Sequence, residues 1–276
     1  MYRALSRTAD NWGLEVCQPA KEFNVSFDEV LGAGATSRVF LASYNDSTEE
    51  KQVACKVFRD ARPYYREKEM LQYLGQKIPT CVINIVAESD SAMQLLLSPR
   101  AFLLRPDDLK SRALARRLLD NINKLHSVGV LHCDLRPENV LVHKRDGKLT
   151  PILIDLGSAV HATQGKFNGR YAGTVRYASN EVLKQLDEGL ADHIHITTKD
   201  DLQSLVRLFY MWVHPGMISY VNMIGNHEYR RVQEFWNGCL QLHQWNEFLI
   251  TSEDDDDASY QRKLNNLISF VFVDIE

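Results

Sequence analysis

The spacing of apolar and polar residues predicts a small β-sheet in the first third of the chain. Residues 23–44 alternate apolar and polar side chains around a glycine-rich stretch, which is typical of a β-hairpin with the glycines at its tip. A polar turn at 45–52 then leads to a third strand at 53–58. Two further apolar runs complete the predicted sheet, at 81–88 and 92–99.

Helical spacing predominates in the rest of the chain. Within the sheet-forming part, residues 64–75 predict one helix, closed by Gly75. Apolar residues recur every three or four positions over 111–129, and residues 200–213 are apolar on nearly every side, as in a helix through the middle of a lobe. We therefore expect an α+β protein with an antiparallel sheet lobe and a mainly helical lobe, divided near 98–101.

Length, charge and cysteines narrow the function. The 276 residues suffice for one large domain or two lobes, and the net charge of -4 offers no basic stripe for nucleic acid. Five cysteines without CxxC spacing favour reduced thiols in the cytoplasm or nucleus over disulfides or zinc. No apolar run reaches the roughly 20 residues that cross a bilayer, so neither membrane nor nucleic acid is expected as a partner. The acidic run 252–257 is expected to be a solvated loop, and the sequence leaves the oligomeric state open.

A glycine-rich turn is the first candidate for chemistry. Gly32 and Gly34 stand between two predicted strands, among small residues that let backbone N–H groups approach a phosphate. An ordinary hairpin turn explains the same residues. A Walker-type phosphate loop is excluded, because no Gly-Lys-Ser/Thr follows and the next predicted element is a strand.

A lysine in an apolar strand is the second candidate. Lys56 is flanked by apolar residues, and a buried ammonium group needs an anionic partner. Glu67 has the helical spacing that directs it to the same sheet. A surface lysine on an edge strand is an equally good interpretation of Lys56 taken alone.

Three oxygen-bearing side chains follow two apolar strands. Asp134 and Asn139 share one loop in the sequence VLHCDLRPENVLV, and Asp155 comes directly after the apolar run at 151–154. Carboxylate and amide oxygens suit Mg²⁺, so Asn139 and Asp155 would hold the metal while Asp134 accepts the proton of an attacking hydroxyl. Turn capping by aspartate explains one carboxylate, but not the set in this order.

Taken in order, these motifs resemble those of protein kinases. The resemblance covers about residues 23–213 and runs through LGAGATSRV, VACK, Glu67, HCDLRPEN, IDLG and GTVRYASNE. GTVRYAS with DDLQSL is similar to the casein kinase 1 group, including vaccinia-related kinases, whereas HCDLRPEN is closer to dual-specificity Tyr-regulated kinases. DDLQSLVR is also similar to crinkler-type effectors, which act inside a host cell after secretion. The resemblance implies a bilobal kinase-like fold with an extension at 1–22, an N-lobe at 23–98 and a C-lobe at 99–276.

Carried over residue by residue, the resemblance implies a site for ATP and Mg²⁺. Lys56, held by Glu67, would bind the α- and β-phosphates beside the turn of Gly32 and Gly34. The adenine would contact apolar side chains and the backbone after the gatekeeper Leu97, namely Val39, Ala54, Leu141, the Ser98 carbonyl and the Arg100 amide. Pro99 fits between the last two because its position needs no N–H group.

The same resemblance assigns the chemistry of transfer. Asp134 would be the catalytic base, and Asn139 with Asp155 the metal ligands. Arg136 would contact the transferring phosphate. Thr174 would line the acceptor site, and Asp201 would brace the catalytic-loop backbone from the central helix.

The sequence departs from the kinase pattern in several places. Cys133 stands where many kinases have the arginine that binds an activation-loop phosphate, and since a thiol cannot form that pair, we expect activity without phosphorylation of that loop. Arg136 replaces the usual lysine of Ser/Thr kinases and keeps its charge, whereas Pro137-Glu138 and Gly173-Thr174 favour Ser/Thr acceptors. Two further replacements are Leu156 for Phe in the DFG triplet and SNE for APE at 179–181.

The leading hypothesis is an ATP- and Mg²⁺-dependent kinase of Ser/Thr residues in protein substrates. One alternative is a small-molecule kinase of the aminoglycoside or choline type, against which the long interval from Asp155 to Glu181 argues, because it is typical of a peptide-docking segment. The other is an ATP-binding pseudokinase scaffold. Against that alternative, the chain retains the full set of Lys56, Glu67, Asp134, Asn139 and Asp155.

Overall fold

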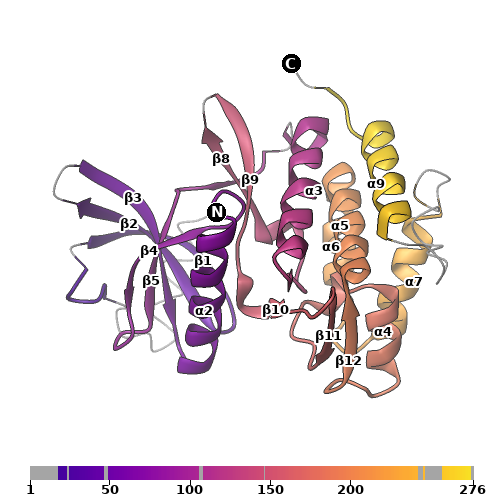
Figure 1. The fold of residues 1–276 in the computed structure, drawn as a ribbon, viewed down its shortest axis with the longest axis horizontal. Helices are drawn as coiled ribbons and strands as arrows, with labels where there is room; N and C mark the ends of the chain where they lie inside the picture. The colour runs from indigo at the N-terminus through magenta and orange to yellow at the C-terminus, as the bar shows by residue number, and fades with distance from the viewer. Residues whose placement is uncertain are drawn as a thin grey trace. The chain divides into compact units, whose positions relative to one another are not determined.

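The chain folds into two compact units, Met1–Ala101 and Phe102–Glu276 (Figure 1). The computed structural model describes residues 18–23, 25–46, 49–105, 108–145, 147–241, 245 and 257–274. Among these residues, no helix combines the length and the apolar character needed to cross a membrane.

The first unit contains a five-stranded antiparallel sheet of order β1-β2-β3-β5-β4. Its strands are β1 (Val25–Ala33), β2 (Ser37–Asp46), β3 (Glu49–Phe58), β4 (Asn84–Ser89) and β5 (Gln94–Ser98). The sheet confirms the predicted lobe, but the predicted polar turn at 45–52 is wrong. The ladder continues through polar residues until Asp46 lies opposite Glu49, because backbone pairing does not require apolar side chains.

Helix α2 (Ala61–Lys77) is longer than predicted at both ends. Gly75 lies inside this helix and does not close it. A Cβ atom at Gly75 would lie 3.2 Å from Oδ1 of Asn84, so the missing side chain allows the helix to approach β4 closely. The cost of one helical glycine, about 1 kcal/mol, is offset by the buried helix face. That face comprises Tyr64, Glu67, Met70, Leu71 and Leu74.

Residues 18–23 pack against the sheet of the first unit. Ala20 and Phe23 are buried in a cluster with side chains of β2, β3 and β5. The buried side chain of Gln94 accepts a hydrogen bond from the Ala20 N–H (2.8 Å) and donates one to the Gln18 carbonyl (2.8 Å). The last residues of the predicted extension therefore pack with this unit, while residues 1–17 lie outside the described part of the chain.

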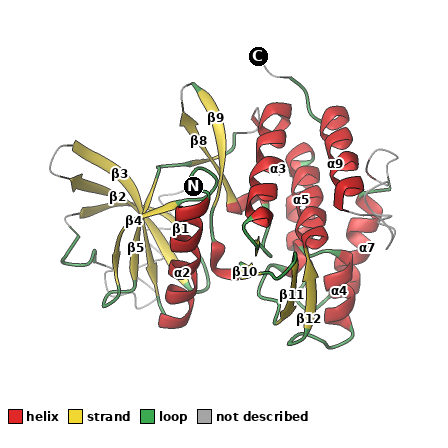
Figure 2. Ribbon diagram, in the orientation of Figure 1, coloured by secondary structure: helices red, strands yellow, loops and turns green. Residues whose placement is uncertain are grey.

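The longest elements of the second unit are among its α-helices (Figure 2). They are α3 (Arg112–Ser127), α4 (Asn180–Asp187), α5 (Thr198–Val213), α6 (Ile218–Asn222), α7 (Tyr229–Cys239) and α9 (Asp257–Val271). Helix α5 packs against α3 and α9 and is buried from Asp200 to Trp212, which confirms the predicted central helix. Of the acidic run 252–257, residues 252–256 lie outside the described residues.

Short strands in the second unit position the polar loops. One sheet has the order β6-β8-β9, and two strand pairs, β7 with β10 and β11 with β12, stand apart from it. Their bounds are β6 (Phe102–Leu103), β7 (Val130–Leu131), β8 (Val140–Arg145), β9 (Lys148–Leu153), β10 (Val160–His161), β11 (Lys166–Gly169) and β12 (Ile194–Thr197). Loop 132–139 joins β7 to β8, and Asp155 follows β9.

Candidate active site

Lys56 and Glu67 form a buried ion pair in the first unit. The Nζ atom of Lys56 lies 2.7 Å from both carboxylate oxygens of Glu67, and the two residues are only 6% and 3% exposed. Lys56 comes from β3 and Glu67 from the buried face of α2, so the predicted contact is confirmed. The Glu67 carboxylate thus supplies a negative charge beside a cation that is buried in an apolar sheet.

Three polar residues at four-residue spacing fasten α2 to β4 and the following turn. Lys68 Nζ lies 2.8 Å from a carboxylate oxygen of Glu88 and 2.5 Å from one of Asp90. Tyr64 donates to Asp90 (2.6 Å), and Gln72 donates to Glu88 (2.8 Å). Hydrogen bonds to Asp90 and Glu88 raise the pKa of Lys68. Because Glu67 lies on the same helix, these contacts fix its position toward Lys56.

The glycine turn and one face of the sheet place the other predicted residues of the first unit. Gly32 lies within β1 opposite Val39, where a Cβ atom would meet no atom within 4 Å, and the N–H of Gly34 in the turn donates to the Ser37 carbonyl (2.8 Å). Cross-strand pairing of Val39 with Lys56 and of Ala54 with Leu97 puts these four side chains on one face of the sheet. Ser98 ends β5, and Arg100 follows it as an exposed residue.

Asp134 lies at the centre of a hydrogen-bonded loop in the second unit. It is 8% exposed, and its Oδ1 accepts the Thr174 N–H at 2.7 Å. Its Oδ2 accepts Nδ2 of Asn139 at 2.9 Å, and Nε of Arg136 lies 3.5 Å away. Since each carboxylate oxygen has two lone pairs, these contacts orient the group and leave acceptor capacity for a substrate proton.

Asn139 and the end of β9 lie side by side. The Asn139 side chain also donates to the Asp134 carbonyl (2.8 Å), so Nδ2 is committed to the loop and Oδ1 is the atom suited to a cation. The Ile154 N–H donates to the Asn139 carbonyl (3.1 Å), which brings Asp155, the next residue, to the same loop. Asp155 has a left-handed backbone (φ 59°, ψ 58°). Leu141 lies two residues after Asn139, in β8.

Asp201 of α5 holds the backbone of loop 132–139, as predicted. Its carboxylate accepts the backbone N–H groups of His132 (2.6 Å) and Cys133 (2.8 Å), and Nε2 of His126 lies 3.1 Å away. Burial opposes ionisation of Asp201, but the hydrogen bonds from His126 and His132 outweigh it, and its pKa lies below the usual value. These bonds hold Cys133 in the left-handed region (φ 61°), which few non-glycine residues adopt.

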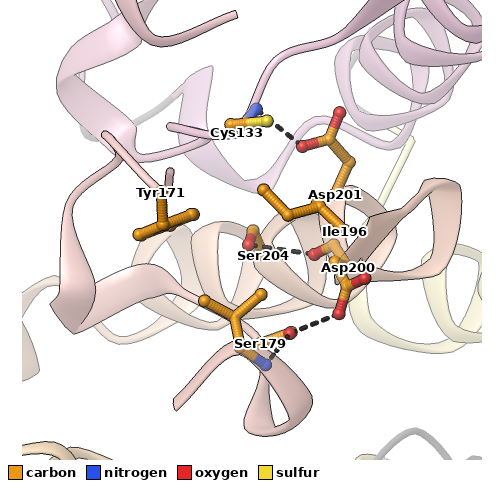
Figure 3. Close-up of a pocket in the computed structure, with 8 residues that line it drawn as sticks. Cys133, Tyr171, Ser179, Ile196, Asp200, Asp201 and Ser204 are labelled. Carbon is orange, nitrogen blue, oxygen red and sulfur yellow. Dashed lines mark hydrogen bonds between the residues drawn. The ribbon is translucent and has the colours of Figure 1, made fainter. Parts of the chain in front are cut away.

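A small cavity lies beneath the loop (Figure 3). Its lining includes Cys133, Asp201 and Tyr171, and its volume of about 10 Å³ is close to the least that one water molecule requires. Burial raises the pKa of Tyr171 well above its usual value, helped by the nearby charge of Asp134. The cavity is therefore too small for a substrate.

The residues that replace APE are anchored to α5, a role that sequence reasoning missed. Ser179 caps α4 and donates to Asp200 (2.5 Å), as Figure 3 shows, while burial raises the pKa of Asp200. The Asn180 N–H donates to Gln203 (2.6 Å), and its side chain accepts from the buried Arg207 (2.6 Å). Asp200, Gln203 and Arg207 are spaced three and four residues apart, so they lie on one face of α5. The sequence DDLQSLVR contains this spacing, but it does not indicate which residues the three side chains contact.

Comparisons with known proteins agree with this geometry. The family model described as "Protein kinase domain" matches residues 25–269. The serine/threonine-protein kinase RAD53 of Saccharomyces cerevisiae is 28% identical over 221 residues, 75% of this chain and 26% of that protein. Sperm motility kinase 2B of Mus musculus is 30% identical over 171 residues, 56% of this chain and 34% of that protein. The serine/threonine-protein kinase ksg1 of Schizosaccharomyces pombe is 28% identical over 201 residues, 61% of this chain and 33% of that protein. The chain thus spans about a quarter to a third of these relatives.

Proposed function

The chain belongs to the protein kinase family, and from this premise we propose that it transfers the γ-phosphate of ATP to Ser/Thr hydroxyls of protein substrates. The observation that carries the proposal is the set of contacts around Asp134. A buried carboxylate that accepts both the Thr174 N–H and the Asn139 amide is oriented as a base, at the segment that the family uses for its acceptor.

In this proposal, residues of the first unit bind the nucleotide. Lys56, held by Glu67, contacts the α- and β-phosphates, and the backbone of Gly32 and Gly34 approaches them. The adenine contacts the apolar residues Val39 and Ala54, the Ser98 carbonyl and the Arg100 amide, with Leu97 as the gatekeeper.

Residues of the second unit position the reacting groups. Asp134 accepts the proton of the attacking hydroxyl, and the cationic Arg136 beside it neutralises charge on the transferring phosphate. The donor set of Asn139 Oδ1 and the Asp155 carboxylate fits Mg²⁺, because both are hard oxygen ligands and the Asn139 amide nitrogen is already committed to Asp134. When bound, Mg²⁺ would supply charge neutralisation at the phosphates.

Acceptor type, regulation and subgroup are further parts of the proposal. Relatives named serine/threonine kinases support a Ser/Thr acceptor. Cys133 carries no positive charge for a phosphate, and its backbone is already held by Asp201, which supports activity without activation-loop phosphorylation. The sequences GTVRYAS and DDLQSL support a place near the casein kinase 1 and vaccinia-related group, with a crinkler-type effector as the other grouping.

The cellular setting is proposed from the thiols. Among the described residues, Cys55, Cys81, Cys133 and Cys239 are thiols that take part in no disulfide, which supports a reducing compartment such as the cytoplasm or nucleus, or a host cell in the case of an effector. The proposed partner is a protein substrate.

The test is transfer of labelled γ-phosphate from MgATP to protein, peptide and small-molecule acceptors. We expect protein labelling by the wild type, also after phosphatase treatment, and loss of labelling in Asp134→Asn and Asp155→Asn. Labelling that survives both substitutions contradicts the assigned residues. Labelling of small molecules alone favours the small-molecule kinase, and thermal stabilisation by ATP without any transfer favours the pseudokinase scaffold.

A further inference from the structure

The activation segment, residues 155–181, contains a tight hairpin. Thr163 and Lys166 exchange two backbone hydrogen bonds, of 2.9 and 3.1 Å. Gln164 and Gly165 between them both have positive φ, 51° and 72°, as a two-residue hairpin turn of the favoured type requires. After the hairpin the chain continues as β11, which pairs with a strand from a later part of the sequence.

That strand is β12, which immediately precedes α5. Residues 166–169 pair antiparallel with residues 194–197, and the Thr198 N–H donates to the Gly165 carbonyl at 3.2 Å. We call this pairing the β11–β12 strap. At its α5 end, Thr197 and Asp200 form a capping box, with the Thr197 N–H and hydroxyl 2.7 and 2.9 Å from the Asp200 carboxylate. A strand fixed in this way is a template for the activation segment.

Gln185 of α4 fixes β12 from its other side. Its Oε1 accepts the His195 N–H at 2.7 Å, and its Nε2 donates to the His195 carbonyl at 3.1 Å, so one amide matches both backbone groups of a single residue. Gln185 is 8% exposed. Across the strap, Nδ1 of His195 lies 2.7 Å from Oδ1 of Asn168, its direct partner in the ladder.

Residues 171–174 of the activation segment make a series of contacts between the strap and Asp134. The Tyr171 N–H donates to the Ala191 carbonyl (3.4 Å), and the Ala172 carbonyl accepts the Ser158 hydroxyl (2.9 Å). Gly173 lies directly against the Cys133 carbonyl, and the next N–H, that of Thr174, donates to Asp134. Backbone groups of the segment are thus held from the hairpin to Thr174, two of them by the side chains of Ser158 and Asp134.

We propose that the β11–β12 strap, fixed by Gln185, holds the activation segment in the position that other kinases secure with a phosphate. Gln185 is a positioning residue: it acts on β12, β12 orders β11, and the ordered segment presents Thr174 to Asp134. This proposal rests on the proposed function, since it names the regulation of the same site.

Gln185→Leu tests the strap, because leucine preserves volume and removes both hydrogen bonds. Lys184→Leu, at the exposed neighbouring position of α4, is the matched control. We expect amide exchange over residues 166–169 to rise about tenfold and kcat for a protein substrate to fall about tenfold, with KM for ATP within about twofold of wild type. The control should match wild type in all three measurements.

A disulfide across the strap should restore the lost function. Asn168→Cys with His195→Cys, placed in the Gln185→Leu background, joins directly paired residues at a separation that suits a disulfide. Oxidation should return exchange and kcat toward wild type, and reduction should abolish the gain.

Unchanged exchange in Gln185→Leu overturns the strap, and faster exchange with unchanged kcat overturns its link to the acceptor site. A wild type that transfers no phosphate defeats the proposed function instead, and the exchange measurement then decides the strap alone.

Discussion

Replacing Asp201 by asparagine should destabilise the second unit. The wild-type carboxylate accepts two backbone N–H groups, from His132 and Cys133, and faces His126 as well. An asparagine has one acceptor oxygen, so its NH₂ group must face one of the two buried N–H groups. One unsatisfied buried donor costs roughly 1–3 kcal/mol, and the loss of a charge-assisted hydrogen bond adds to it, giving a total of roughly 2–4 kcal/mol.

Urea unfolding followed by tryptophan fluorescence measures this loss. The chain has four tryptophans, and Trp212 and Trp236 are buried in the second unit. Amide exchange at His132 and Cys133 should rise in Asp201→Asn, because the carboxylate holds these two groups. Asp192→Asn is the control: Asp192 is 77% exposed in its side chain and 3.8 Å from Arg170, so its replacement should leave stability unchanged within error.

The stability difference between wild type and Asp201→Asn should also depend on pH in a defined direction. The pKa of Asp201 is lower in the folded chain than in the unfolded one, so its contribution is complete above the unfolded pKa of about 4 and is lost as pH falls through the folded value. The stability difference between wild type and Asp201→Asn should therefore shrink below about pH 4. A difference below about 0.5 kcal/mol at pH 7, or one that grows in acid, would refute the reasoning.

Two further substitutions test the first unit. Glu67→Gln should lower stability by roughly 3–5 kcal/mol in urea unfolding and raise KM for ATP, because it removes the negative charge that lies 2.7 Å from the buried Lys56 ammonium, whereas Glu88→Gln, at a partly exposed carboxylate in β4, should raise KM far less. Equal effects of the two would contradict the role of the pair. Phe23→Ala should lower stability by roughly 3–5 kcal/mol in urea unfolding, because its ring is buried against the sheet; a Phe23→Ala variant as stable as wild type would show that residues 18–23 do not support the sheet.

Local patterns predicted the elements with strong periodicity and failed where packing decided. The sheet and helices α3 and α5 follow from alternation and helical spacing. Gly75 looked like a helix end because glycine is a poor helix former, yet the contact with Asn84 makes it a packing position. The strap was missed, since four residues such as KFNG or IHIT carry little signal and their pairing joins segments far apart in the sequence.

In the candidate site, too, some contacts could be predicted from the sequence and others could not. The Lys56–Glu67 contact could be predicted because a buried lysine requires an anionic partner, and Glu67 has the spacing to supply it. The contact between Asp201 and the catalytic-loop backbone could be predicted from the kinase resemblance. Both contacts are confirmed. The docking of residues 18–23 onto Gln94 could not be predicted, because a single buried glutamine gives no indication of a partner 76 residues away. The nucleotide and metal assignments stay predictions.

The contact at Gly173 offers a way to separate two parts of the proposed function, phosphate transfer and nucleotide binding. A methyl group there would lie 1.9 Å from the Cys133 carbonyl oxygen, which is backbone and cannot swing aside, so the activation segment and the catalytic loop would have to part. None of the residues assigned to the nucleotide is touched by that change. If the proposed function holds, Gly173→Ala should therefore impair phosphate transfer while leaving the proposed nucleotide-binding residues in place.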